Sequence, residues 1–205
     1  MKAFVKYFFL IVLLISCNEE KQLLDYSQQR ANQFVEKHAD KFIKDSELLR
    51  YSYNPRAQFT NSQDSSNRYR IYQRRNEIEL ICFSDSCELE ESFNKIPLKI
   101  YKGRYTLKQD SLFVNLNNDS TALQIHSFKR NPVDYFNELN MRLKNYGVFN
   151  YFGSKDKSFI KVYFSTQYYL IHSYDVENDI GQDELLKSYD NNWYFVKMKH
   201  KMDLG

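Results

Sequence analysis

Glycine and proline are scarce in this sequence, which has five Gly and three Pro among 205 residues. Such a composition excludes collagen-like repeats, low-complexity segments and a long flexible tether. No internal repeat occurs at a fixed period, and there is one Trp against 17 Tyr and 16 Phe. Because tyrosine and phenylalanine favour strands and half-buried surfaces, this aromatic content indicates a globular chain rich in β-structure.

Catalytic motifs are missing as well. The sequence has no Gly-x-Ser-x-Gly, no His-Glu-x-x-His and no phosphate-binding loop. Two Ser-x-x-Lys matches, at 154–157 and 158–161, lie in a predicted loop and strand and lack the Lys-Thr-Gly that accompanies this motif in penicillin-binding enzymes. Catalytic groups can converge from distant positions, but the sequence favours a protein that is not an enzyme.

Metal-binding patterns are weak. The four histidines are far apart and have no clustered carboxylates, so packing or surface roles are expected for His38, His126, His172 and His200. Carboxylates alternate over 175–187, as they do in calcium loops. However, Ile180 and Leu186 stand where an EF-hand requires Gly and Glu. We expect a solvated acidic loop and no cofactor, with weak calcium binding as the alternative.

The charge balance is close to neutral, with a formal net charge of +3. It therefore gives no general attraction for nucleic acid. Two of the positive charges, Lys2 and Lys6, precede an apolar run over 7–15, and the small residue Ser16 follows that run. This order is typical of a secretory signal peptide. The run is shorter than the ~20 apolar residues that cross a bilayer, and no second run follows, so we do not expect an integral membrane protein.

The segment Leu14-Ile15-Ser16-Cys17 resembles the lipobox of bacterial lipoproteins. This resemblance implies that residues 1–16 are removed as a signal peptide and that Cys17 carries lipid at the new N-terminus. Several acyl chains would then hold the chain in the cell envelope. The following Asn18-Glu19-Glu20 is similar to the surface-export signals of Bacteroidetes lipoproteins, which implies the outer membrane, on its periplasmic or surface face. A solvated acidic helix start is the alternative for this tripeptide.

The two remaining cysteines, Cys82 and Cys87, are five positions apart. Because an exported chain meets oxidising conditions, we predict a disulfide between them, with free thiols as the alternative. The intervening Ser84-Asp85-Ser86 is typical of turns and is expected to form a tight loop. A zinc site is not expected, because two further ligands at suitable spacing are missing.

The periodicity predicts one α+β domain over 17–205, with a subdivision near residue 130 as an alternative. An amphipathic helix is expected over 20–44, and Asn131, Pro132 and Gly147 mark the ends of a second helix. Period-two patterns predict an antiparallel meander with the second helix inserted between its strand groups. Strands are expected at 68–74, 77–83, 96–101, 104–109, 111–116, 121–128, 148–152, 158–165, 167–174 and 192–199, and a turn of helix at 184–186. Whether the strand groups form one sheet or two is left open.

One face of strand 68–74 is the best candidate for a contact surface. In an extended conformation, Arg68, Arg70, Tyr72 and Arg74 would lie on the same side. Guanidinium groups beside aromatic rings suit a protein partner's acidic patch or an anionic glycan. A solvated sheet face is the alternative.

The function expected from these features is that of a lipid-anchored, non-enzymatic binding or accessory module of the envelope. The stretch GRYTLKQDSLFVNL, at 103–116, resembles a hairpin of small lipocalin-like bacterial lipoproteins. That resemblance implies an alternative, a carrier of a small hydrophobic ligand. An immunity lipoprotein that neutralises a toxin is a further alternative.

Overall fold

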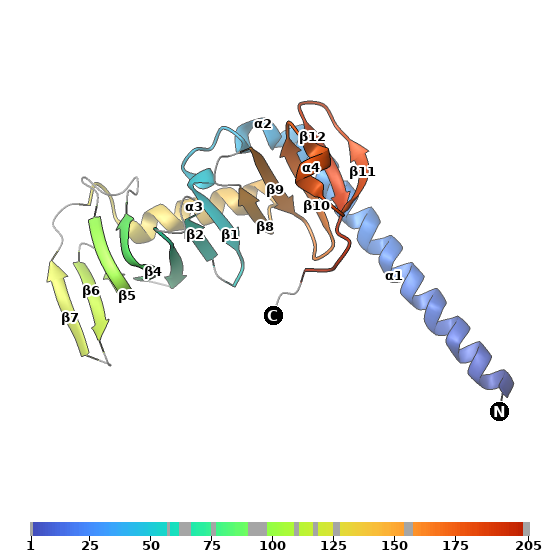
Figure 1. Ribbon diagram of the computed structural model, residues 1–205, viewed down its shortest axis with the longest axis horizontal. Helices are drawn as coiled ribbons and strands as arrows, with labels where there is room; N and C mark the ends of the chain where they lie inside the picture. The colour runs from blue at the N-terminus through green and yellow to red at the C-terminus, as the bar shows by residue number, and fades with distance from the viewer. Residues whose placement is uncertain are drawn as a thin grey trace.

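The computed structural model describes most of the chain. The described residues are 2–56, 58–61, 67–74, 77–89, 98–108, 111–116, 119–124, 128–153 and 158–202. Within them, helices and strands form the α+β fold that the sequence predicts (Figure 1). The helices are α1 (Lys2–Lys37), α2 (Ala39–Phe42), α3 (Pro132–Tyr146) and α4 (Val176–Ile180), with a short 3-10 helix at Leu48–Arg50.

Twelve strands form one sheet in which every neighbouring pair is antiparallel. The first group is a meander of β1 (Tyr51–Asn54), β2 (Gln58–Asn61), β3 (Tyr69–Arg74), β4 (Glu77–Leu89), β5 (Leu98–Lys108), β6 (Ser111–Leu116) and β7 (Asp119–Gln124). The second comprises β8 (Asn150–Gly153), β9 (Phe159–Tyr163), β10 (Tyr168–Ser173), β11 (Glu184–Ser188) and β12 (Trp193–Lys197). The strand order is β11-β12-β10-β9-β8-β1-β2-β3-β4-β5-β6-β7. The groups meet where β1 pairs with β8, through Tyr53 and Tyr151.

Helix α3 begins and ends where its sequence signals place it. The Asn131 side chain accepts a hydrogen bond from the Val133 amide at 2.8 Å, and Pro132 occupies the first helical turn. At the other end Gly147 adopts a left-handed conformation, with φ of 65°, and its amide bonds back to the last turn. These two caps define where α3 begins and ends. The helix covers one face of the meander (Figure 1).

The predicted N-terminal helix is confirmed, but it forms two helices. Helix α1 ends at Lys37, and α2 follows after His38, whose φ of −128° and ψ of −24° interrupt the helical conformation. Ser27, Ala31 and Phe34 are buried against the sheet, whereas Glu19 and Glu20 are exposed. The N-terminal part of α1 thus projects away from the sheet (Figure 1).

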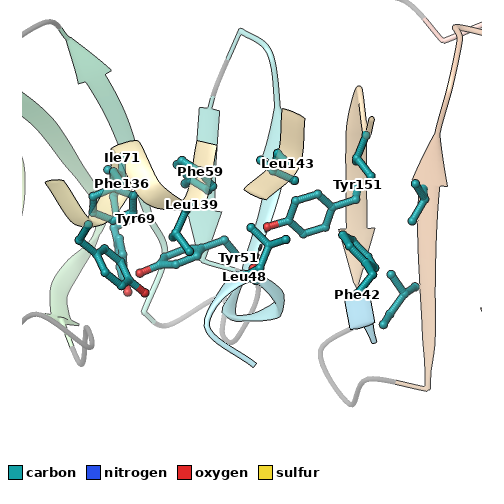
Figure 2. Packing of buried hydrophobic residues seen from close by; sticks show 14 of the residues in the cluster. Phe42, Leu48, Tyr51, Phe59, Tyr69, Ile71, Phe136, Leu139, Leu143 and Tyr151 are labelled. Carbon is teal, nitrogen blue, oxygen red and sulfur yellow. Dashed lines mark hydrogen bonds between the residues drawn. The ribbon is translucent and has the colours of Figure 1, made fainter. Parts of the chain in front are cut away.

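The main core lies between α3 and the sheet and is rich in aromatic rings (Figure 2). Phe136 is fully buried, and its ring centroid lies 5.3 Å from that of Phe59 and 5.7 Å from that of Tyr51. Tyr151, also buried, donates a hydrogen bond from its hydroxyl to the Leu48 carbonyl at 2.7 Å. These contacts join α3, β1, β2 and β8, so the two strand groups share one core.

Cys82 and Cys87 form a disulfide, with sulfurs 1.97 Å apart and Cα atoms 5.9 Å apart. The predicted tight loop between them is wrong, because β4 continues through residues 83–85 as an irregularity in its pairing with β5. Residues five apart in a regular strand point to opposite faces. The irregularity instead turns both cysteines to the buried side, where they are 2% and 0% exposed.

Three strands were not predicted: β1, β2 and β11. The first two have four residues each, too few to show a clear alternation. The helical turn predicted at 184–186 is wrong, since these residues belong to β11, an end strand whose five residues are all exposed. Without a buried side there is no period-two signal, and the neighbouring Leu185 and Leu186 imitate a helix. The composition of residues 109–110 and 117–120 predicts a turn and a hairpin loop. Residues 109–110 and 117–118 lie outside the described residues, but Asp119 and Ser120 belong to β7, so the loop predicted at 117–120 is too long. Lys108 pairs with Ser111 and Leu116 with Asp119.

An ion-pair network fastens α3 to the segment before β1. Arg142 contacts Asp45 at 3.0 Å, Glu47 at 2.9 Å and also Glu138. The hydrogen bond from Arg142 lowers the pKa of the Glu138 carboxyl below its ordinary value. A lowered folded-state pKa means that this stabilisation is present above the ordinary pKa of a glutamate and is lost as the pH falls through the folded-state pKa.

We expect Arg142→Met to lower the free energy of unfolding by about 1–3 kcal/mol at pH 7, because three carboxylates lose this donor, although Arg130 still pairs with Glu47 and Glu138. Protonated carboxylates no longer need that donor, so the difference from the unchanged protein should shrink at pH 3. Denaturant unfolding at both pH values measures this. Lys144→Met removes the same charge from the same helix and should have little effect. A deficit equal at both pH values would contradict the electrostatic account.

Candidate functional site

Strand β3 presents its two sides differently, as its alternation predicts. Tyr69 and Ile71 are buried beneath α3, while Arg70, Tyr72 and Arg74 lie on the opposite side of the sheet. The adjacent Arg68 is exposed. The predicted placement of these four residues on one side is confirmed; their role in contacting a partner stays a prediction.

Neighbouring strands extend this side into a larger surface. Arg70 pairs with Ile81 of β4, and Ile81 pairs with Arg104 of β5, which places a further guanidinium on the same side. Phe83, two residues beyond Ile81, is 41% exposed. We call this surface the arginine face, and it consists of Arg68, Arg70, Tyr72, Arg74, Phe83 and Arg104.

Phe83 forms an aromatic platform for two of the arginines. The guanidinium carbon of Arg70 lies 5.1 Å from its ring centroid, and that of Arg68 lies 5.9 Å from it. The backbone holds this arrangement, because the Phe83 amide donates to the Arg68 carbonyl at 2.9 Å and the Arg68 amide donates to Ser84 Oγ at 2.8 Å. The disulfide closes the same irregular part of β4, so it helps to set the position of Phe83.

Glu79 organises the other two arginines. It lies between Arg74, at 2.6 Å, and Arg104, at 3.5 Å. The two arginine side chains are 63% and 68% exposed, against 14% for Glu79. Exposed ion pairs of this kind contribute little stability. These ion pairs instead orient the side chains, since Glu79 restrains two guanidinium groups while most of their N–H donors remain exposed to solvent.

Arg68 and Arg70 have no ion-pair partner among the described residues, and the buried Nε of Arg70 has no hydrogen-bond acceptor there. Planar guanidinium groups donate paired hydrogen bonds to carboxylate, sulfate or phosphate groups. The arginine face can therefore bind an extended anionic surface through several such groups. The sequence alone did not indicate Phe83 or Arg104, because their place on this side depends on the strand register.

The other sequence candidates do not come together. Within the described residues, no group of three or more His, Cys, Asp or Glu side chains could hold a metal ion. Burial lowers the pKa of His172, and burial together with Lys37 and Lys41 lowers that of His38, so both favour the neutral form. His126 and 154–157 lie outside the described residues.

The acidic loop predicted at 175–187 contains α4 and the start of β11. Two of its carboxylates accept hydrogen bonds within the fold: Asp179 from Ser173 Oγ at 2.5 Å, and Asp183 from the Tyr169 hydroxyl at 2.8 Å. Asp183 also accepts from the Lys199 amide at 2.9 Å. These carboxylates therefore have structural roles that a calcium ion would have to replace.

Cys17, the predicted lipidation residue, lies within α1, ten positions before Ser27, where the helix first becomes buried. Among the described residues, no helix is both long and apolar enough to cross a membrane. Comparison with protein-family models, curated proteins and solved structures gives no match to this chain.

Proposed function

We propose that this chain is a lipid-anchored binding protein of the bacterial cell envelope, attached through Cys17, and that it uses the arginine face to hold an anionic partner. The partner would be a protein with an acidic patch or an anionic glycan. The single observation that carries the proposal is the arginine face itself, on the side of the sheet opposite α3: two of its four guanidinium groups lie beside the exposed ring of Phe83, and the other two pair with Glu79.

The fold is compatible with attachment to a membrane through Cys17 and with exposure of the arginine face to a partner. Ser27 follows Cys17 by ten positions, which at about 1.5 Å of helical rise per residue amounts to ~15 Å. A lipid on Cys17 would therefore leave a short helical stem between the bilayer and the domain. Such a stem keeps the sheet close to the membrane while its open side stays accessible to partners.

The sheet favours a binding protein over a carrier. Within the described residues, the strand order begins at β11 and finishes at β7, and these two end strands do not pair with each other. A lipocalin-like carrier encloses its ligand in a closed barrel. The apolar side of this meander is instead filled by α3, with Phe136 and Leu139 fully buried against it.

The triple variant Arg68→Glu, Arg70→Glu, Arg74→Glu tests the proposal. Binding to immobilised poly-glutamate and to an immobilised uronic-acid polysaccharide is measured at about 0.1 M salt, where surface charges interact over ~10 Å. We expect the unchanged protein to bind at least one of them and the variant to lose about a hundredfold or more in affinity. The melting temperature should change little, because the altered side chains lie on the solvated side of the sheet.

A matched variant separates the arginine face from overall charge. Lys41→Glu, Lys44→Glu and Lys129→Glu change the net charge by the same amount at exposed positions elsewhere. This control should keep most of the affinity. Equal losses in the two triple variants, or full binding by the arginine variant, would contradict the assignment of this face.

A further inference from the structure

A second basic site lies away from the arginine face, where α1 meets the end of α3. A hollow of about 250 Å³ is bordered by Arg30, Lys37 and His38 from the end of α1 and by Lys144 and Tyr146 from α3. Phe34 and Phe164 supply apolar walls, and both are buried. The hollow therefore combines cationic groups at its edge with aromatic rings at its base.

The charges around this hollow have one sign. Its border contains one guanidinium and two ammonium groups beside the His38 imidazole, and no aspartate or glutamate is among the described residues that line it. Like charges gathered in one concave place repel one another, and a bound anion relieves that repulsion. Tyr146 is oriented by a 3.4 Å contact from its hydroxyl to Asp45, outside the lining, and its ring packs edge-on against His38 at 5.7 Å.

Arg30 is held in place at the edge of the hollow. Its Nη2 donates to the Gly147 carbonyl at 2.8 Å, which leaves the other guanidinium N–H groups available. A Cβ atom added at Gly147 would lie 2.6 Å from the same Nη2, so only glycine permits this close approach. Gly147, which ends α3, thus also positions the Arg30 guanidinium, so its N–H donors are in place before any ligand binds.

We propose that this hollow binds a small phosphate-bearing anion, either inorganic phosphate or a phosphomonoester group. Arg30 would supply paired donors, Lys37 and Lys144 the additional positive charge, and the His38 and Tyr146 rings the wall against which an ester carbon packs. The volume is below the ~300–1,000 Å³ of pockets that enclose drug-sized ligands, which fits a small anion. Because α1 and α3 both border the hollow, the bound anion would hold the end of α1 against the end of α3.

The pKa of His38 should show whether an anion is bound in the hollow. Burial and the nearby charges of Lys37 and Lys41 lower its pKa, and Arg30 and Lys144 border the same hollow. A doubly charged anion in the hollow would oppose these effects and raise the pKa of His38. His200 is exposed and does not border the hollow, so it serves as an internal reference.

The experiment follows the imidazole NMR signals of the purified protein as inorganic phosphate replaces chloride at constant ionic strength. We expect a saturable shift of the His38 signal, an upward shift of its pKa and no change at His200. The signal is assigned with His38→Gln. The double variant Arg30→Gln, Lys144→Gln should weaken binding at least about tenfold, because it removes the paired donors and two positive charges. Lys129→Gln, an exposed residue outside the hollow, should not weaken it.

A second arm identifies the source of the phosphate group. Vesicles that contain phosphatidic acid, whose headgroup is a phosphomonoester, are compared with vesicles of phosphatidylcholine alone, in the absence of inorganic phosphate. A His38 shift with inorganic phosphate but not with phosphatidic acid vesicles assigns a soluble ligand. A shift with phosphatidic acid vesicles but not with phosphatidylcholine vesicles assigns a lipid headgroup. If neither inorganic phosphate nor phosphatidic acid moves the His38 signal, or if Lys129→Gln weakens the effect as much as the double variant does, the proposal is overturned.

Discussion

Cys17→Ser is expected to abolish the partition of this protein into a detergent phase. In bacterial lipoproteins the thiol receives the lipid, and a serine hydroxyl would not replace it in that reaction. Each buried CH₂ contributes about 0.8 kcal/mol, so losing several acyl chains removes nearly all of the free energy of membrane attachment. Phase separation of whole-cell detergent extracts measures the partition, and mass spectrometry of the purified protein should show residues 1–16 still attached.

The remaining cysteines provide the control for this prediction. The double variant Cys82→Ser, Cys87→Ser removes the disulfide but leaves Cys17 unchanged. It should partition into detergent like the unchanged protein, although it should be less stable, by up to the ~2–4 kcal/mol typical of a disulfide. Acyl groups found by mass spectrometry on the Cys17→Ser protein, or missing from the unchanged protein, would contradict lipid attachment at this residue and would remove the anchor from the proposed function.

Local signals in the sequence were sufficient for the second helix. Asn131, Pro132 and Gly147 act through hydrogen bonds and backbone angles within a few residues of themselves, so their effect does not depend on the rest of the fold. The alternation over Ile78, Leu80 and Cys82 likewise predicted their burial, because each is next to a side chain of opposite character.

The sequence was insufficient wherever pairing between distant segments decides the structure. The bridge between β1 and β8 joins residues about a hundred positions apart, and no local pattern marks Tyr53 and Tyr151 as partners. The irregularity in β4 was also missed, since Ser84-Asp85-Ser86 has the composition of a turn. The strand nevertheless continues through it, and pairing with β5 resumes at Ser86. Strand β11 was missed for a different reason: it is exposed on both sides, so its sequence shows no alternation of apolar and polar residues.

The residues of the candidate sites likewise fall into those that a local pattern predicts and those that only the fold brings together. The side of β3 that carries Arg68, Arg70, Tyr72 and Arg74 followed from alternation alone. Phe83 and Arg104 joined it only through register, and the hollow beside Arg30 required the end of α1 to meet the end of α3. Both proposed binding surfaces are assembled from several elements, which explains why no short motif in the sequence marks them.

The core beneath the arginine face gives the largest expected effect on stability. Phe136 is fully buried in α3 and contacts the rings of Tyr51, Phe59 and Tyr135. Phe136→Ala removes the ring where the helix meets β1 and β2, and such truncations cost about 3–5 kcal/mol. Because whole domains are stable by only about 5–15 kcal/mol, the variant should be close to unfolding at room temperature. Urea unfolding measures the loss through a lower midpoint at an unchanged slope.

Met141→Ala is the matched control, since Met141 lies in the same helix but is 62% exposed, and it should change stability by no more than about 0.5 kcal/mol. Helix α3 and the arginine face lie on opposite sides of β3, so the folded fraction of the Phe136→Ala protein should bind anionic probes as the unchanged protein does. Binding should then fall along the unfolding curve and not ahead of it. A stability loss below about 1 kcal/mol would mean that α3 does not cover the sheet at this position, and the side of β3 assigned to partners would have to be reconsidered.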